Sequence, residues 1–323
     1  MQALNESIKI TTGNDYLKRF WNHMRGNAFS GDTSNAFIND GNGYLFPDDT
    51  EKKFRKELEK QSSIRSIAKT IKLYVDGKVK AYDSDDQVQL VRENQPIPGF
   101  DVDEDFEEQP IGKYKFAGLF KAKMDYARDA SFGFEDYIIK RMAKSFGKAE
   151  DNIFINGYGP DDNEPCGLAD NKYGAMVGAT TGSVTYDDCL DLFYSVKPEY
   201  RKNATWLMND KTALALRKLK DNAGNYLWNS ANDTILGRPV CICNEMPDAK
   251  AGYIPIYFGD FDYYWIIDRS PMRVKVLTER FMFDNKIGYI GSEFLDSVLV
   301  RRDAVKALRV SGVPDEDYIP REY

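Results

Sequence analysis

One apolar stripe in the middle of the chain constrains the fold more than any other feature. Its members recur every three or four residues, which is the spacing of one buried face of an α-helix. They are Phe134, Ile138, Met142, Phe146, Ala149 and Ile153. The stripe predicts a single long helix with one face in the core of the protein.

The predicted helix runs into a glycine turn. The stretch "AEDNIFINGYG" ends with Gly157-Tyr158-Gly159, a spacing that also occurs in phosphate-binding loops. A dinucleotide loop places its glycines after a strand and before a helix, so that the helix N-terminus faces the phosphates. Here the glycines follow the helix, where a left-handed cap suits glycine because it has no Cβ atom. We therefore expect the turn to end the helix and to bind no nucleotide.

Length and charge narrow the class of protein. A chain of 323 residues can form one large domain or two ordinary ones with a sizeable core. It has no apolar run of membrane-spanning length and no signal-peptide layout at its N-terminus, so we expect a cytoplasmic protein without a membrane partner. The net charge of -7 argues against a protein that grips nucleic acid, because that task needs clustered Lys and Arg.

Side chains that carry chemistry are scarce. The only histidine is His23, which removes most general-base and triad schemes. The pair Glu150-Asp151 has no histidine or cysteine close to it in the sequence. With so few ligands a zinc site is poorly supplied, and we expect reduced cysteines in the core. The cysteines are Cys166, Cys189, Cys241 and Cys243. We assign no catalytic, cofactor-binding or metal-binding residue, and we expect neither an enzyme nor a cofactor.

Two alternating, strand-like segments at 71–75 and 113–124 flank the main charge anomaly of the chain. Asp76-Gly77 is a hairpin signal after the first, and in the second one face carries lysines 113, 115, 121 and 123. Between the two segments, residues 83–108 hold ten acidic side chains against Arg92 alone. A loop of this length is usually functional or disordered. It is either a solvated acidic loop or an arm that pairs with the basic surface of a neighbouring molecule.

The polar N-terminal region, residues 1–42, contains one amphipathic piece, "DYLKRFWNHMRG". Its apolar face, formed by Leu17, Phe20, Trp21 and Met24, must meet another surface. A helix follows at about 48–62, with Asp48 or Asp49 as its cap. We expect the two extended arms to be unable to bury their apolar residues within their own subunit, which indicates an assembly component.

The second half of the chain changes character near Thr185, which caps a helix with Asp188. "TWLMN" predicts a buried strand, "DKTALALRKLKD" a helix capped by Asp210, and "ILGRPVCICNEMP" a strand-turn-strand unit. Seven aromatic residues lie in Tyr253–Trp265; they form either core and subunit contacts or a carbohydrate platform. Closing strands are predicted at 272–277, 287–291 and 296–301. Long helices with scattered, non-repeating strands give an α+β fold.

Taken in order, several segments make the chain resemble the major capsid proteins of tailed bacteriophages, which have the Hong Kong 97 fold. The resemblance covers about 43–310. The segments are "GYLFP" (43–47), "SSIR" (62–65), "KAEDNIFINGYG" (148–159), "EPCGL" (164–168), "YRKNATWLMN" (200–209), "LRKLKDNAGNYLW" (216–228), "LGRPV" (236–240), "MP" (246–247), "FGDFDYYWIIDR" (258–269) and "DAVKAL" (303–308).

The resemblance implies a division of the chain into the parts of that fold. The implied parts are an N-terminal arm (1–60), an E-loop hairpin with its flanking strands (61–130), a peripheral domain with a spine helix (131–184), an apical domain (185–285), and the return strands and tail of the peripheral domain (286–323). It also implies hexamers and pentamers that close into an icosahedral shell around phage or prophage double-stranded DNA. Scaffold, protease and portal proteins are the implied partners, and assembly in the cytoplasm of a bacterial host is the implied location.

Two departures from the family pattern matter. Many members carry a scaffold segment before the arm, whereas this chain begins almost at the arm, so the scaffold is either a separate protein or already removed. Some members cross-link a lysine to an asparagine with a glutamate as base; lysines 72, 78, 80 and 113, with Asn285 and Glu293, are the candidates here. Two other functions stay open at this point, an encapsulin-like shell around a cargo enzyme and an aromatic-rich carbohydrate-binding protein.

Overall fold

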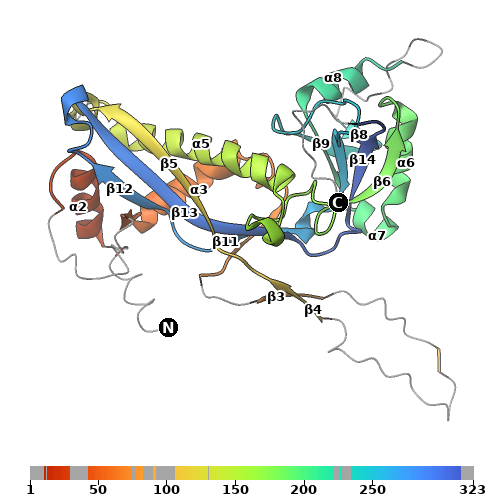
Figure 1. Ribbon diagram of the computed structural model, residues 1–323, viewed down its shortest axis with the longest axis horizontal. Coiled ribbons are helices and arrows are strands. Elements are labelled where there is room, and N and C mark those ends of the chain that lie inside the picture. Colours follow the sequence, from red (N-terminus) through yellow and green to blue (C-terminus); the bar gives the residue numbers. More distant parts are fainter. Residues whose placement is uncertain are drawn as a thin grey trace.

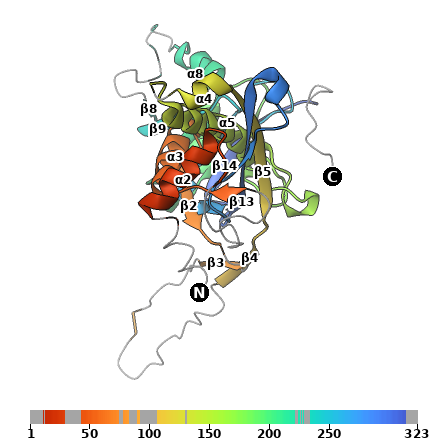
Figure 2. The ribbon, with the colours of Figure 1, turned by 90° about the vertical axis from the view of Figure 1, so that its left-hand side faces the viewer.

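The computed structural model describes residues 11, 13–29, 43–74, 78–82, 90–91, 106–129, 131–220, 224, 226, 228 and 234–313. Within them the chain forms two six-stranded sheets and a separate two-stranded hairpin. The first sheet is long and lies beside the long helix, the second is compact, and the hairpin projects away from both (Figures 1 and 2). Helices and strands are interspersed, so the expected α+β class is confirmed.

The helices have the following bounds. The α-helices are α2 (Asn14–Met24), α3 (Asp48–Gln61), α4 (Met124–Arg128), α5 (Phe134–Asn156), α6 (Tyr186–Ser195), α7 (Pro198–Arg201) and α8 (Asp210–Arg217). The 3-10 helices are η1 (Pro160–Asp162), η2 (Phe261–Tyr263) and η3 (Met282–Asp284). The predicted long helix is confirmed as α5, and the predicted helix at 48–62 as α3.

The strands are β1 (Tyr44–Leu45), β2 (Lys69–Lys72), β3 (Lys78–Tyr82), β4 (Phe106–Pro110), β5 (Tyr114–Lys123), β6 (Met176–Thr181), β7 (Thr205–Met208), β8 (Thr234–Ile235), β9 (Arg238–Ile242), β10 (Ile256–Gly259), β11 (Tyr264–Asp268), β12 (Arg273–Leu277), β13 (Lys286–Leu299) and β14 (Val305–Val310). In the second half of the chain, β6 to β10 and β14 belong to one six-stranded sheet, and β11 to β13 belong to the other.

The first sheet is organised around β13. Its order is β1-β12-β13-β11-β2, and β5 pairs with the other edge of β13. The sequence predicted two strands at 287–291 and 296–301, but β13 is one continuous strand of 14 residues. Continuity is stable because β5 pairs with β13 along its first ten residues, and β12 and β11 share its other edge.

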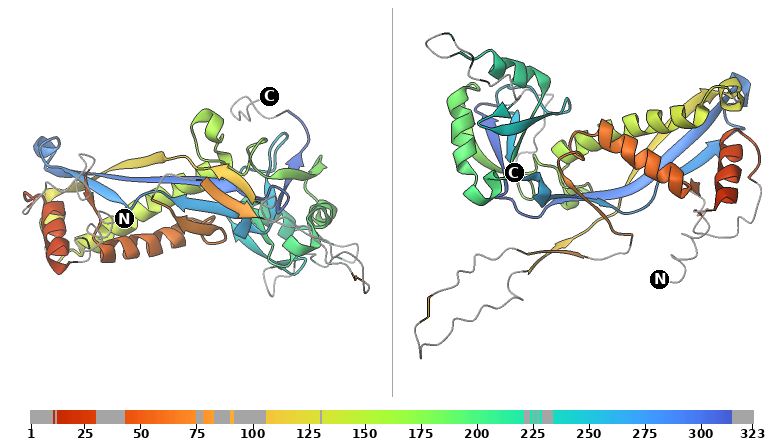
Figure 3. Two further views of the ribbon diagram at one scale, coloured as in Figure 1. Left: turned by 90° about the horizontal axis from the view of Figure 1, so that it is seen from below. Right: turned by 180° about the vertical axis from the view of Figure 1, so that it is seen from behind.

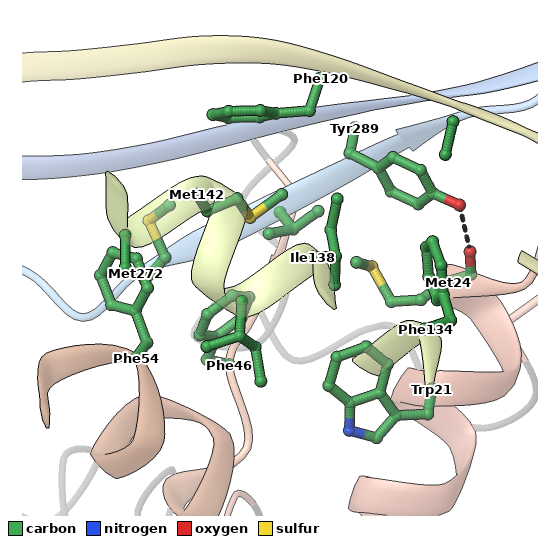
Figure 4. Close-up of a cluster of buried hydrophobic side chains, with 14 of the residues drawn as sticks. Trp21, Met24, Phe46, Phe54, Phe120, Phe134, Ile138, Met142, Met272 and Tyr289 are labelled. Atoms are coloured by element: carbon green, nitrogen blue, oxygen red, sulfur yellow. Dashed lines mark hydrogen bonds between the residues drawn. The ribbon is translucent and has the colours of Figure 1, made fainter. Parts of the chain in front are cut away.

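The core beneath the first sheet joins α5 to both helices of the N-terminal region (Figure 4). Phe54 and Leu58 of α3 and Ile138 and Met142 of α5 are buried there. Each such side chain contributes roughly 1.5–3 kcal/mol when fully buried. The amphipathic face of α2 belongs to the same core, and the Tyr289 hydroxyl at its edge donates a hydrogen bond to the Met24 carbonyl at 2.8 Å.

This packing corrects the expectation that the arms cannot bury their apolar residues within one subunit. Phe20, Trp21 and Met24 are at most 5% exposed in the single chain. The amphipathic pattern showed that this face must be covered, but a pattern does not show which surface covers it. For the described part of the arm, the covering surface is the chain's own core.

The end of α5 also differs in detail from the expectation. The helix ends at Asn156 with Gly157 as its cap, so the glycine turn does terminate it. Gly157 has φ -61° and ψ 139°, however, and is not left-handed. Glycine is needed there because a Cβ atom would lie 2.4 Å from the Pro165 carbonyl oxygen. The positive φ, +78°, occurs at Gly159.

The second sheet has the order β6-β14-β10-β7-β9-β8. Thr185 and Asp188 form the predicted capping box of α6. Two predicted caps are wrong: Asn209, not Asp210, caps α8, and Pro47, not Asp48 or Asp49, precedes α3. In both cases the acidic residues lie in the first turn of the helix, where a carboxylate interacts favourably with the helix dipole.

The two sheets do not follow the expected ranges along the chain. Strands β11 and β12 fall within 185–285 but pair with β13 in the first sheet, and β14 returns to the second sheet between β6 and β10. The hairpin signal at Asp76-Gly77 and most of the predicted acidic loop, residues 83–89 and 92–105, lie outside the described residues.

Candidate functional site at the root of the projecting hairpin

The hairpin of β3 and β4 is the part of the described chain that reaches away from the body, as two perpendicular views show (Figures 1 and 2). Its outgoing side continues from β2, which pairs in parallel with β11. Its return side continues into β5. The place where these two sides leave the first sheet is the candidate site, because it determines the direction of the hairpin.

Both sides of the hairpin are held by polar contacts to the first sheet. On the outgoing side the Leu73 amide donates to the Asp268 carbonyl at 3.0 Å, and Arg269 Nη1 donates to the Leu73 carbonyl at 2.9 Å. On the return side the Gly112 amide donates to Asp296 Oδ2 at 2.6 Å. Arg269 and Asp296 also attract one another electrostatically. The two sides are therefore fixed by one pair of oppositely charged residues on β13 and at the end of β11.

An apolar patch supports the same root. Ile267, Val298 and Val300 are buried on the face of the sheet that is turned toward the hairpin, and Leu73 and Ile111 pack against them. Burial of this kind adds a non-directional attraction to the directed hydrogen bonds. The hairpin thus leaves the body from a packed base.

Behind the root lies a group of six buried or nearly buried charged residues, called here the charge cluster. Its members are Glu51, Arg55, Arg65, Glu150, Asp268 and Glu293. They come from α3, from the turn after it, from α5, from β11 and from β13. The cluster therefore joins the N-terminal helix, the long helix and the strands that carry the hairpin.

Arg65 occupies the centre of the charge cluster. Its guanidinium donates to both carboxylate oxygens of Glu150, at 2.7 and 2.9 Å, and to Asp268 Oδ1 at 2.9 Å. Arg55 lies beside it, 2.8 Å from Glu51, 2.8 Å from Glu293 and 3.4 Å from Asp268. Forked contacts of this kind fix the relative positions of the elements, because a planar guanidinium accepts few orientations.

Asp151, next to Glu150, holds the turn between α3 and β2. Its carboxylate accepts hydrogen bonds from the Ser62 hydroxyl at 2.6 Å, the Ser63 amide at 2.9 Å and the Ile64 amide at 3.2 Å. The Cys243 thiol lies 3.7 Å from the same carboxylate. The sequence placed no cysteine near Asp151, because this contact spans more than ninety residues. Burial raises the pKa of Cys243 to about 12, so the thiol stays protonated.

The charge cluster contains four carboxylates and two guanidinium groups. Burial raises the pKa of Glu293 to about 8; the nearby carboxylates of Glu150 and Asp268 add to this effect, and the two arginines oppose it. For Asp268 burial also acts to raise the pKa, but Arg65 and Arg55 outweigh it and hold the pKa below its usual value. One carboxyl group, Glu293, therefore carries a proton near neutral pH, which reduces the excess of negative charge.

Asp296, at the root itself, is a second buried acid with a raised pKa. Burial raises its pKa to about 6, against the backbone amides of Gly112 and Ser297 and the charge of Arg269, which act to lower it. At neutral pH the ionised carboxylate accepts both amide hydrogen bonds. Its charge thus supports the attachment of the return side.

The cross-linking candidates do not come together in one subunit. Glu293 belongs to the charge cluster, whereas the Asn285 side chain is exposed, 3.5 Å from Asp125. Eight residues of extended chain separate them, about 26 Å at 3.3 Å per residue. Lys113 lies over the Phe294 ring at 4.8 Å and Lys72 ends β2. Lys78 and Lys80 are placed on β3, and their side chains lie outside the described residues.

The remaining sequence candidates have structural positions. Cys166, Cys189 and Cys243 are buried and all four cysteines are free. In the aromatic band, Tyr257, Phe258, Phe261 and Tyr264 are at most 2% exposed. The band is therefore core, and the carbohydrate platform is not supported, because sugar stacking needs exposed rings.

Sequence reasoning missed the charge cluster, although a signal for it was present. Arg65 lies in "SSIR", Glu150 and Asp151 in "KAEDN", and Asp268 and Arg269 in "WIIDR". These are three of the segments that carry the family resemblance, and the structure brings them to one place. The other members of the cluster, Glu51, Arg55 and Glu293, lie outside every such segment, and only the fold brings them to this place.

Within the described residues, no group of three or more His, Cys, Asp or Glu side chains is placed to hold a metal ion. None of the helices that the structure describes is both long and apolar enough to span a membrane.

The root is thus a packed base of hydrogen bonds and apolar contacts from which the hairpin projects. Residues 42–310 match the model of the phage capsid family. The chain belongs to this family and is a structural protein of a capsid. A comparison with curated protein sequences found no match.

Solved structures agree with this assignment. A capsid of a native GTA particle is 28% identical to this chain, with a TM-score of 0.62, and the match covers 77% of this chain and 90% of that one. A structure from Gordonia phage Cozz is 15% identical, with a TM-score of 0.55 and coverage of 78% and 87%. A virus-like particle from Pyrococcus furiosus is 12% identical, with a TM-score of 0.51 and coverage of 80% and 98%. The last two show a shared fold only.

Proposed function

We propose that this chain is the major subunit of an icosahedral capsid, which it builds through hexamers and pentamers around double-stranded DNA. The observation that carries the proposal is the match of the phage capsid family over residues 42–310. The 28% identity to the capsid of a GTA particle supports it. A scaffold, a protease and a portal protein are the proposed partners, and the cytoplasm of a bacterial host is the proposed place of assembly.

The architecture is consistent with a subunit of this kind. The two sheets serve as peripheral and apical parts, α5 as the spine of the peripheral part, and the hairpin of β3 and β4 as the extended loop. A rooted hairpin that leaves its own subunit offers its backbone and side chains to a neighbour. The contacts of Arg269 and Asp296 with the two sides of the hairpin then fix the angle at which the hairpin approaches the neighbour.

Electron microscopy of the purified chain tests the proposal. We expect closed shells or capsomer rings in negative stain, and a fast-sedimenting species in analytical ultracentrifugation, with a scaffold protein supplied if the chain needs one. A compact monomer at high concentration in the presence of the scaffold would contradict the proposal. Shells that hold a protein cargo and no nucleic acid would favour the encapsulin-like alternative.

We also expect unassembled subunits to bind duplex DNA weakly, because a packaged genome must stay mobile. The net charge of -7 does not favour phosphate binding. Three of the four cations in the densest basic run, Lys211, Arg217, Lys218 and Lys220, have partners: Lys211 pairs with Asp248 at 2.8 Å, and Arg217 and Lys220 lie over aromatic rings. A fluorescence titration with a long duplex near physiological salt should show negligible binding. Submicromolar binding under these conditions would favour a nucleic-acid-binding role.

A further inference from the structure

The first sheet has one face packed on helices and one face without them. Helices α3 and α5 lie on the same side of β5 and β13 (Figure 3), and the inward residues, such as Phe120, Val274 and Tyr289, belong to the core. The residues that alternate with them point the other way. In the antiparallel register Lys121 is opposite Gly288 and Leu119 is opposite Ile290.

This outward face is positively charged. The outward positions of β5, of β12 and of β13 up to Phe294 hold no acidic residue, and Asp296, further along β13 at the hairpin root, is the first carboxylate on this side. Within the described part of the chain, no carboxylate lies within 4.0 Å of the amino groups of Lys115, Lys121, Lys123 or Lys286. This surface is called here the lysine face. Its basic residues are Lys113, Lys115, Lys121, Lys123, Lys275 and Lys286.

The register adds an unfavourable pair within the lysine face. Lys123 is directly opposite Lys286, and like charges at directly opposed positions destabilise a sheet. An isolated subunit reduces this repulsion only by solvation and salt screening. An anionic partner on this face would remove it.

The floor between the lysines is partly apolar. Leu119 is 45% exposed, and Ile290 and Phe294 are half-buried. Lys113 and Lys121 lie over the Phe294 and Phe281 rings, at 4.8 and 4.5 Å from their centroids. A surface of cations and apolar side chains is complementary to a peptide that carries both acidic and apolar residues.

We propose that the lysine face binds the acidic segment, residues 83–108, of a second copy of this chain. This inference rests on the proposed function and specifies which surface the hairpin of a neighbour meets. The segment carries ten acidic residues and Arg92, and its "DVDEDFEE" stretch places Val102 and Phe106 among carboxylates. Charge and apolar content thus complement the lysine face.

The partner is a second copy and not the same subunit, because the hairpin leaves at the end of β5 opposite to Lys123 and projects from the body. Strands β3 and β4 project from the body in both perpendicular views (Figures 1 and 2). Lys123 lies at the far end of β5 from the root, ten residues beyond Lys113. The two strands that flank the acidic segment therefore lead away from the lysines at the far end of β5 in the same subunit.

Two other roles for these lysines give different experimental outcomes. The second edge of β5 has no partner strand among the described residues, and lysines on an edge strand prevent aggregation. Duplex DNA is the other anion that such a face can bind. The acidic segment is favoured over DNA because each subunit supplies one segment for each face, and because the floor contains apolar side chains.

Reciprocal charge reversal tests the inference. The face variant carries Lys115→Glu, Lys121→Glu and Lys123→Glu, and the segment variant carries Asp103→Lys, Glu104→Lys and Asp105→Lys. A third variant combines all six changes. The control reverses three exposed lysines of α5 by Lys140→Glu, Lys144→Glu and Lys148→Glu. Circular dichroism and thermal melting establish that each subunit is folded before shell yield is measured by sedimentation.

We expect each reversal alone to reduce shell yield about ten-fold, and the combined variant to recover most of the loss, because electrostatic complementarity sets register and association rate. The control should assemble like the parent. If the face and segment variants assemble like the parent, the inference is wrong while the capsid function stands. If the parent itself forms no assembly, the proposed function fails first.

A peptide measurement keeps the inference testable when a variant does not assemble or fold. A fluorescently labelled peptide of residues 99–110 should bind unassembled parent subunits at low salt, and about ten-fold more weakly after Lys121→Glu alone. Unchanged peptide binding would overturn the inference. If the parent binds duplex DNA but not the peptide, and Lys121→Glu loses the duplex binding, the face would be assigned to nucleic acid instead. Aggregation of the face variant with unchanged peptide binding would leave only the edge-protection role.

Discussion

Replacing Arg65 by methionine should destabilise the subunit strongly, since Arg65 neutralises two carboxylates in the interior. Its three hydrogen bonds, at 2.7, 2.9 and 2.9 Å, go to Glu150 and Asp268, which are 0% and 1% exposed. After the change Asp268 keeps Arg55 at 3.4 Å, but no described cation is paired with Glu150. Breaking a buried pair by removing one partner costs about 3–5 kcal/mol.

The assay is thermal unfolding of unassembled subunits, followed by circular dichroism and tryptophan fluorescence. For a chain of this length a loss of about 3–5 kcal/mol corresponds to a decrease of roughly 4–7 °C in Tm. The control is Lys148→Met, an exposed cation two residues before Glu150 on α5, which should change the unfolding free energy by less than about 0.5 kcal/mol.

A double variant separates the lost charge pair from the lost volume. Glu150→Gln removes the orphaned charge, so the combination Arg65→Met with Glu150→Gln should be more stable than Arg65→Met alone, by about 1–3 kcal/mol. The reasoning would be refuted by an Arg65→Met variant as stable as the Lys148→Met control, or by a double variant no more stable than the single one.

Two further predictions concern a titrating acid and a glycine. The pKa of Glu293 is raised to about 8 in the folded subunit, so protonation of Glu293 favours the folded state. The parent should therefore lose stability, on the order of 3–5 kcal/mol, as the pH rises from about 5 through 8. Glu293→Gln should flatten the decrease of Tm with pH, and parallel curves for the parent and the variant would contradict the assignment. Gly43→Ala should cost about 2–4 kcal/mol in a urea unfolding titration, because Gly43 has φ +121° and a Cβ there would lie 2.5 Å from the backbone of Val274. Gly182→Ala is the control, because its Cβ would meet nothing within 4 Å, and it should be close to neutral. Equal urea midpoints for the two variants would count against the steric argument.

The sequence alone predicted the elements whose signals are local. The apolar stripe of α5, the alternation of β5 and the capping box at Thr185 each repeat or close within a few residues, so a periodic pattern reveals them. The order of short segments also predicted the family, and residues 42–310 match it. Patterns of this kind show that a face is buried or that a helix begins, because both follow from neighbouring residues.

The tertiary structure decided what each face packs against. The face of α2 was predicted to be covered, but the surface that covers it is the subunit's own core. The continuity of β13 depends on three partner strands from distant parts of the chain. Gly157 is required by the approach of Pro165 and not by a left-handed cap.

The charge cluster could not be predicted from the sequence for the same physical reason. Arg65 lies 85 residues from Glu150 and 203 from Asp268 along the chain. A charged residue in a sequence is by default solvated, and its burial is stable only when the fold supplies an opposite charge and hydrogen bonds at a distance of about 3 Å. Neighbouring residues in the sequence do not show which distant charges will meet. Only the tertiary structure brings these charges within that distance.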